Sequence, residues 1–144
     1  MKNMKGFTLL EVLFTLAILS ILITLSAPLT ISSLAKHQEK QFFQTLQFDV
    51  MLVQNLSINN NNYIRIKLND KSYELINGAR SKPIAIRNLP KKWYITKQNL
   101  DTISFNRDGS IRRAGTIKIT TEQSSYNVVF PLGKGRGYIN IDKE

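Results

Sequence analysis

Hydrophobic and polar residues follow three successive patterns along the chain, and the first is an apolar run near the amino terminus. No charged residue occurs from Val12 to Ala35, and Glu11 is the only one between Phe7 and that run. These twenty-four residues would span about 36 Å as an α-helix, more than the roughly 30 Å of a membrane hydrocarbon core. Because backbone groups in lipid must pair within their own segment, residues 7–35 are predicted to form a transmembrane helix.

The residues that flank this run predict its orientation. Lys2 and Lys5 precede it, and positive residues favour the cytoplasmic side, so we expect a single-pass protein with a cytoplasmic amino terminus and an extracytoplasmic remainder.

A cleaved secretory signal fits poorly, because Pro28 follows the small residues Ser26 and Ala27 and because the run exceeds the roughly 7–15 residues of a signal's apolar region. An uncleaved signal anchor is the remaining alternative. Pro28 also predicts a kink in the helix.

The second pattern, over residues 36–58, has the spacing of an amphipathic helix. Apolar positions recur every three or four residues at Phe42, Leu46, Val50, Val53 and Leu56. The opposite side carries Lys36, Lys40, Gln44, Gln47 and Gln54. This pattern predicts that the helix continues beyond the membrane segment and packs its apolar side on a β-sheet.

The third pattern alternates with a period of two and predicts a β domain over residues 63–144. Four asparagines at 59–62 end the helix. Residues 63–68 and 72–76, joined by a turn, predict a hairpin. Further strand candidates, with a turn at 106–109, are residues 84–86, 93–95, 102–105, 115–121, 125–130 and 138–141. One long helix followed only by short strands predicts an α+β fold with a small antiparallel sheet.

Composition limits the size and the partners of this domain. The chain has 144 residues, which corresponds to one modest domain plus an anchor, and it has no cysteine. Its formal net charge is +10. The segment from Arg80 to Arg136 contains twelve basic residues and only three acidic ones. This asymmetry indicates an anionic partner such as nucleic acid, anionic lipid or a teichoic-type polymer. Simple solubility at a charged cell surface is the alternative.

The sequence offers little for catalysis, a metal or a cofactor. There is no cysteine nucleophile, the single histidine lies beside the predicted membrane segment, and the acidic residues of the second half are scattered: Asp101, Asp108 and Glu122. The glycines at 133, 135 and 137 lack the strand–turn–helix context of a phosphate loop and favour a β-turn. We therefore expect no enzymatic activity, no metal site and no cofactor.

Glu11 is the residue that a plain anchor leaves unexplained, because a carboxylate in a membrane helix costs about 2.5–3.5 kcal/mol. Residues 5–11, Lys-Gly-Phe-Thr-Leu-Leu-Glu, resemble the class III signal of type IV pilins and pseudopilins. The resemblance implies that a prepilin peptidase removes residues 1–6 by cutting between Gly6 and Phe7, and that the new amine of Phe7 is methylated. It also implies that Glu11 pairs with the terminal amine of a neighbouring subunit, which lowers the cost of burying both charges.

The β region has a second resemblance. The segments 103–105, 108–110, 115–119 and 133–136 follow in the order typical of GspH/FimT-like minor pseudopilins, and the chain most resembles the ComGD type of Gram-positive competence machinery. The resemblance implies a structural subunit of a competence pilus that supports DNA uptake, with its C-terminal domain at the cell surface after assembly. A type II secretion pseudopilin and a membrane-anchored extracytoplasmic DNA-binding protein are the alternatives, and an anchored enzyme or cell-wall binder is a further one.

Direct contact with DNA is a separate hypothesis. Some FimT-type pilins carry a glycine–basic motif that contacts DNA, and the loop with Lys134 and Arg136 resembles it. The candidate phosphate-binding residues are Arg107, Arg112, Arg113, Lys134 and Arg136. Three aromatic residues are candidates for stacking on bases, namely Trp93, Tyr94 and Tyr138. Packing of these aromatics within a sheet is the alternative.

Overall fold

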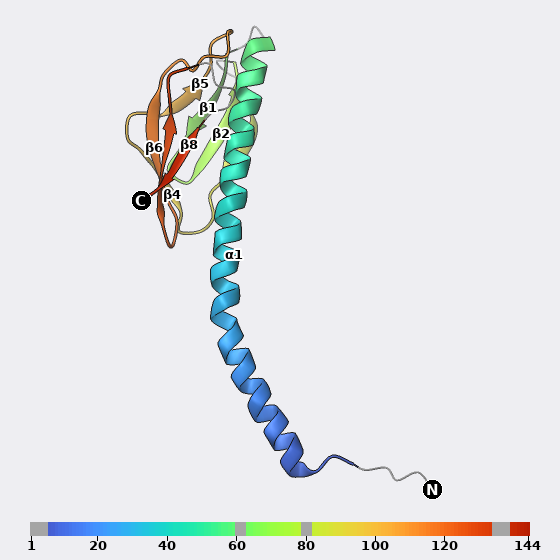
Figure 1. Ribbon diagram of the computed structural model, residues 1–144. Coiled ribbons are helices and arrows are strands. Elements are labelled where there is room, and N and C mark those ends of the chain that lie inside the picture. The colour runs from blue at the N-terminus through green and yellow to red at the C-terminus, as the bar shows by residue number, and fades with distance from the viewer. Residues whose placement is uncertain (1–5, 60–62, 79–81, 134–138) are drawn as a thin grey trace. The chain divides into compact units, whose positions relative to one another are not determined.

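The computed structural model describes residues 6–59, 63–78, 82–133 and 139–144, without the side chains of residues 26–32 (Figure 1). The chain forms two compact units, Met1–Gln41 and Phe42–Glu144. Several predicted features lie outside the described residues: residues 1–5 of the leader, Lys134, Arg136 and Tyr138.

One long helix, α1 (Leu9–Asn59), accounts for the first two sequence patterns. It continues through Pro28, and the kink at this residue stays a prediction. The predicted membrane segment includes residues 26–32, whose side chains lie outside the described part. Among the helices of the described residues, none is both long enough and apolar enough to cross a membrane.

The part of α1 within the second unit is amphipathic, as its spacing predicts. Leu46, Val50 and Val53 are at most 1% exposed, whereas Gln44 and Gln47 are exposed. Gln54, predicted to lie on the polar side, is instead buried, and this prediction was wrong. Its Nε2 donates a 2.6 Å hydrogen bond to the carbonyl oxygen of Gly109, so a partner distant in sequence satisfies the buried amide.

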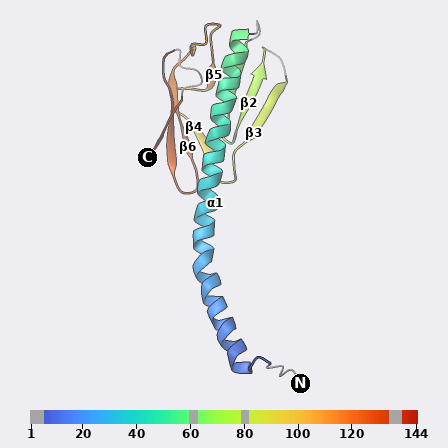
Figure 2. The ribbon, with the colours of Figure 1, turned by 45° about the vertical axis from the view of Figure 1, so that its right-hand side comes forward.

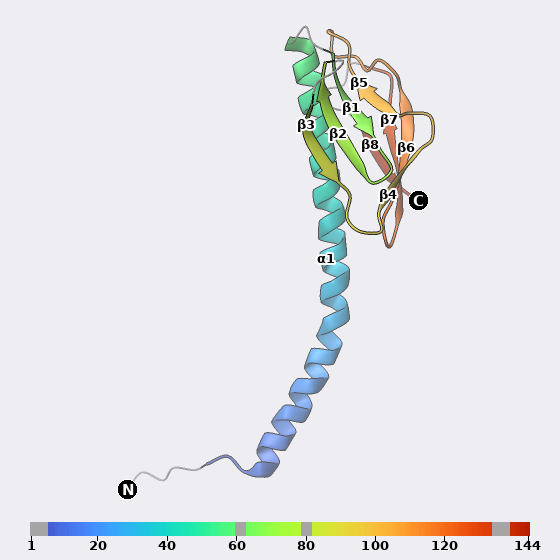
Figure 3. The same ribbon diagram turned by 180° about the vertical axis from the view of Figure 1, so that it is seen from behind.

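In the described part of the chain, eight strands follow the helix and form two antiparallel sheets, where the sequence predicted a single sheet. The first has the order β3-β2-β1-β5, which Figure 3 shows from behind. Its strands are β1 (Ile64–Leu68), β2 (Ser72–Asn77), β3 (Pro83–Asn88) and β5 (Thr102–Ser104). The second has the order β4-β6-β7-β8, with β4 (Tyr94–Lys97), β6 (Gly115–Thr120), β7 (Ser125–Phe130) and β8 (Asn140–Lys143).

The first predicted hairpin is confirmed in position. Strands β1 and β2 pair antiparallel, from Ile64 opposite Asn77 to Leu68 opposite Tyr73. Along β1 the buried side chains are those of Ile64, Ile66 and Leu68, so the alternate positions face away from the core. This alternation explains why the local sequence predicts the strand correctly.

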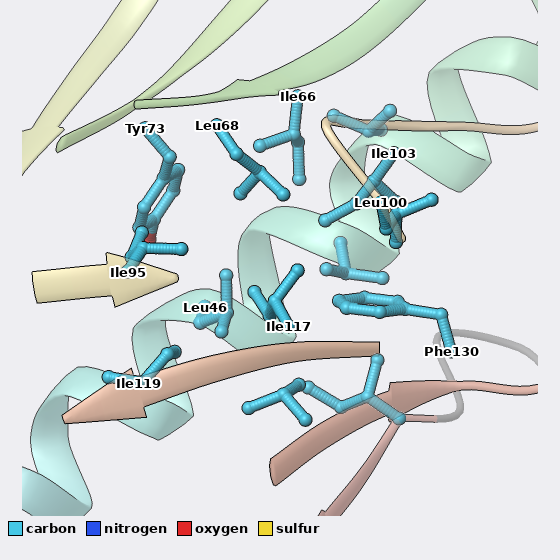
Figure 4. Close-up of a cluster of buried hydrophobic side chains, with 14 of the residues drawn as sticks. Leu46, Ile66, Leu68, Tyr73, Ile95, Leu100, Ile103, Ile117, Ile119 and Phe130 are labelled. Atoms are coloured by element: carbon cyan, nitrogen blue, oxygen red, sulfur yellow. The ribbon is translucent and has the colours of Figure 1, made fainter. Parts of the chain in front are cut away.

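The hydrophobic core of the second unit lies between the two sheets and the helix. In Figure 2, β2 and β3 lie on one side of α1, and β4 and β6 lie on the other. Figure 4 shows Leu46 of α1 among side chains from both sheets, including Ile66, Ile117 and Phe130, all of which are at most 1% exposed. The second unit is therefore an α+β domain in which one helix contributes to a core shared by two sheets.

A buried carboxylate links the helix to the first sheet. Asp49 of α1 is fully buried and accepts hydrogen bonds from the Tyr73 hydroxyl at 2.9 Å and from Arg87 Nε at 3.0 Å. Burial, together with the charge of Asp49, raises the pKa of Tyr73. The hydrogen bond to Asp49 raises the pKa of Arg87. These bonds satisfy a carboxylate that would be costly to bury alone and tie β2 and β3 to the helix.

Candidate functional site

The residues around the predicted cleavage position lie just outside helix α1. Gly6, Phe7 and Thr8 are exposed and precede the helix, which begins at Leu9. Thr8 is the N-cap, because its Oγ1 accepts a 3.3 Å hydrogen bond from the backbone N–H of Glu11. A Cβ atom placed on Gly6 would meet nothing within 4 Å. Packing within the described chain therefore does not require glycine at position 6.

Glu11 lies in the first turn of α1, and its side chain is exposed. Thr8 and Glu11 have the Ser/Thr-x-x-Glu spacing of a capping box. A carboxylate in the first turn also interacts favourably with the helix dipole. The family resemblance implied a role for Glu11 between subunits. This local role was not predicted, although the spacing between the two residues was a sufficient signal.

The helix surface that follows Glu11 is apolar and exposed on every side. Side chains from Val12 to Leu25 have high exposure, for example 61% at Phe14 and 59% at Leu22. Exposed apolar residues at nearly every position mark a helix that is covered by something other than its own chain. This surface is where lipid or another protein would lie.

Three of the predicted phosphate-binding arginines lie on one short hairpin. Asn106 and Ser110 are joined by a backbone hydrogen bond of 2.8 Å, and a bridge pairs Phe105 with Ile111. Gly109 adopts a φ of 81°, which favours glycine, and an added Cβ would come within 3.2 Å of Ile58 at the end of α1. The exposed arginines on or beside this turn are Arg107, Arg112 and Arg113.

Arg112 does not stand alone on this surface. Its guanidinium carbon lies 4.8 Å from the centre of the Tyr63 ring, and that of Arg65 lies 5.2 Å from the same ring. Tyr63 and Arg65 were not among the site residues predicted from sequence. Their positions two apart in an alternating strand were the available signal, because such residues share one face of a sheet.

The aromatic residues proposed to stack on bases have different environments. Trp93 is only 3% exposed and belongs to the core, so its predicted contact with bases is wrong. Tyr94 is 43% exposed, and its ring lies 5.6 Å from Lys71 Nζ. The same two residues line an open hollow of about 540 Å³ near Asp70 and Lys97, which form an ion pair of 3.7 Å.

The acidic and histidine side chains do not gather into a metal site within the described residues. No group of three or more His, Asp or Glu residues could hold a metal ion in that part of the chain. The carboxylate of Glu144 is placed instead beside Lys118 and Asn127, and these hydrogen bonds lower its pKa. The strongest candidate sites are therefore the start of α1 and the basic surface around Tyr63.

Comparison with known proteins agrees with the first of these sites. Residues 1–27 match the family model of the prokaryotic N-terminal methylation motif. The chain is 28% identical over 142 residues to the competence protein ComGD of Bacillus subtilis (strain 168), covering 97% of this chain and 94% of that protein. No solved structure matches. The chain therefore carries a prokaryotic N-terminal methylation motif and is similar to ComGD along nearly its whole length.

Proposed function

We propose that the chain is a minor pseudopilin of a competence pilus, processed by a prepilin peptidase and assembled through its amino-terminal helix to support DNA uptake. The observation that carries the proposal is the methylation motif over residues 1–27 in a chain similar to ComGD along nearly its whole length. This similarity favours a competence pilus over a type II secretion pseudopilus. The chain acts as a structural subunit that associates with other pilus components.

The conformation around Gly6 supports the cleavage step. The bond between Gly6 and Phe7 is exposed and lies outside α1, so a peptidase reaches it without unwinding the helix. Because no atom lies within 4 Å of a Cβ on Gly6, a larger residue leaves the folded chain undisturbed. Recognition by the peptidase, and not folding of the chain, then requires glycine at position 6. Residues 1–6 are the leader that the peptidase removes.

The apolar surface of α1 supports the anchoring and assembly steps. Residues 7–35 insert as a single-pass helix, with the domain of residues 63–144 on the extracytoplasmic side, and later enter the filament core. The exposed apolar side chains from Val12 to Leu25 are covered by lipid in the first state and by neighbouring helices in the second. When the helix moves from lipid into the filament core, Glu11 pairs with the methylated amine of Phe7 in an adjacent subunit. Burying the two charges as a pair costs less free energy than burying each one alone.

Mass spectrometry of the membrane-extracted protein tests the processing step. We expect a chain that starts at Phe7 and carries one added methyl group. The variant Gly6→Val should keep residues 1–6, while the fluorescence of the single tryptophan, Trp93, reports an unchanged unfolding transition. An intact Met1 in cells with an active prepilin peptidase would contradict the proposal.

The variant Glu11→Ala separates assembly from processing. We expect normal cleavage after Gly6 and a large loss of the subunit from sheared filaments, because the neighbouring Phe7 amine loses its carboxylate partner. Thr8→Ala is the matched control, since it removes the N-cap and retains the Glu11 carboxylate. Cleavage that requires Glu11 as strictly as it requires Gly6 would contradict this division of roles.

A further inference from the structure

The outer face of the first sheet carries two arginines on one tyrosine ring. Tyr63 immediately precedes β1, and Arg65 lies within it. Arg112 follows the bridge between Phe105 and Ile111, and its backbone N–H donates to the carbonyl oxygen of Ser104 in β5. Figure 3 shows β5 beside β1. Two segments separated by more than forty residues thus bring their cations to one place.

The geometry holds these two cations close together. Their guanidinium carbons lie 5.2 Å and 4.8 Å from the centre of the Tyr63 ring, so they are no more than 10 Å apart. At the 10 Å limit, slightly more than the Debye length of about 8 Å at physiological salt, repulsion between the two charges is largely screened, and it grows as the separation falls below that length. Attraction to the ring offsets part of that repulsion. An anion bound between the two guanidinium groups would be attracted to both of them.

Among the described residues, the hydrogen bonds that position the cluster use one N–H donor of each guanidinium. The Tyr63 hydroxyl donates to Ser104 Oγ at 3.2 Å, which fixes the ring. Arg65 Nη1 donates to the carbonyl oxygen of Gly78 at 2.9 Å, and Arg112 Nε donates to that of Phe105 at 3.4 Å. A guanidinium has five N–H donors. The ion pairs among the described residues involve other side chains, at Arg87, Lys92, Lys97 and Lys118.

The surroundings of the cluster indicate a linear ligand. Arg65 and Lys67 occupy alternate positions in β1, and Tyr63 lies two positions before Arg65, just ahead of the strand. Side chains two positions apart in a strand follow one another at about 6.7 Å on one face of the sheet. Lys67 is exposed, although Glu74 lies opposite it in the neighbouring strand. A row of cations that begins at Arg112 and continues along a strand fits a polymer with repeating anions better than a single carboxylate.

We propose that Arg65 and Arg112, held on Tyr63, form a binding site for the phosphodiester backbone of an anionic polymer. Guanidinium groups bind phosphate oxygens through paired N–H donors. Contacts to phosphate alone carry no sequence information. The site shares Arg112 with the DNA-binding residues predicted from sequence and adds Arg65 and Tyr63, and it does not depend on the proposed function in pilus assembly.

The test measures fluorescence anisotropy with the full chain in a nonionic detergent. The probes are a single-stranded oligonucleotide and a poly(glycerol phosphate) of similar length, which separate nucleic acid from a wall-type polymer, with polyglutamate as the carboxylate control. We expect binding of at least one phosphate polymer. Two phosphate contacts predict a loss of about sevenfold in affinity between 50 and 200 mM salt, from a slope of about −0.7 per contact on a single strand. Equally tight binding of polyglutamate would overturn the phosphate assignment.

A charge-matched pair of double variants tests the location. Arg65→Gln with Arg112→Gln should weaken binding at least tenfold at 50 mM salt. Arg107→Gln with Arg113→Gln removes the same charge from the neighbouring exposed arginines and should weaken binding no more than about threefold. Equal losses in the two double variants, or no binding by the unaltered chain, would overturn the site.

Tyr63 provides a second and independent measurement. Tyr63→Phe keeps the ring and should bind within about twofold of the unaltered chain, whereas Tyr63→Leu removes the ring and should weaken binding at least fivefold. The unfolding transition reported by Trp93, which lies in the core, shows whether each variant is folded. A folded Tyr63→Leu variant with unchanged affinity would contradict the role of the ring.

Discussion

The two parts of helix α1 differ in what surrounds them. From Val12 to Leu25 the helix is apolar and exposed at nearly every position, while from Phe42 to Asn59 it has one buried apolar face and one exposed face. Each part also carries a carboxylate in a different setting. Glu11 is exposed in the first turn, whereas Asp49 is fully buried with Tyr73 and Arg87 as hydrogen-bond partners.

This difference shows that one continuous element serves two purposes. The later part satisfies its apolar and polar groups inside its own domain, so its sequence is constrained by the fold. The earlier part has apolar groups that the described chain leaves uncovered, so its sequence is constrained by an external environment. Substitutions in the two parts should therefore affect different measurements.

The largest contrast is expected between Leu46→Ala and Leu16→Ala. Leu46 is 1% exposed within the core, and Leu16 is 57% exposed. Leu46→Ala should lower the free energy of unfolding by about 3 kcal/mol through lost burial and a cavity, and Leu16→Ala by less than about 0.5 kcal/mol. Urea unfolding followed by Trp93 fluorescence measures both. Similar losses would show that the earlier part also packs on the domain.

The two carboxylates give the next contrast. Asp49→Asn should lower the free energy of unfolding by about 2–3 kcal/mol, below the roughly 3–5 kcal/mol of a fully buried broken pair because the Arg87 side chain is 43% exposed. Glu11→Gln, in the exposed first turn, should change it by less than about 0.5 kcal/mol. The same urea measurement applies. A stable Asp49→Asn variant would show that the link between the helix and β3 contributes little.

The smallest contrast concerns high pH. The pKa of Tyr73 is raised in the folded state, so the neutral phenol stabilises the fold below the ordinary tyrosine pKa of about 10, and this contribution is lost as pH rises above it. The free energy of unfolding should fall by about 1.4 kcal/mol per pH unit above pH 10, and less steeply in Tyr73→Phe. Residues 7–35 contain no tyrosine, so the helix content of that segment should not fall with pH above 10 in this way. Identical slopes in the two proteins would contradict the assignment to Tyr73.

Local patterns in the sequence predicted the elements well. Alternation gave both strands of the first hairpin, and the Asn-Arg-Asp-Gly turn appears where expected, with Gly109 at positive φ. The three-and-four spacing gave the buried positions Leu46, Val50 and Val53. These features depend on residues within one or two turns of each other, which is the range that a pattern can report.

Features that depend on distant partners could not be predicted in the same way. The burial of Gln54 follows from the Gly109 carbonyl, 55 positions away, and the burial of Asp49 follows from Tyr73 and Arg87. The division into two sheets depends on which strands pair, which alternation alone does not specify. Tyr63 and Arg65 gain their relation to Arg112 only when β5 pairs with β1.

The helix that enters the core also determines how the domain responds to force. Within the second unit, side chains of the helix and of strands β1, β2, β6 and β7 share one buried core. A pull along the helix axis loads the contacts of Leu46, Val50 and Val53, and the bonds of Asp49, at the same time rather than one after another. Contacts loaded in parallel resist sliding more strongly than contacts that peel apart in sequence. The helix of the second unit should therefore resist withdrawal from its core as a group of contacts and not one contact at a time.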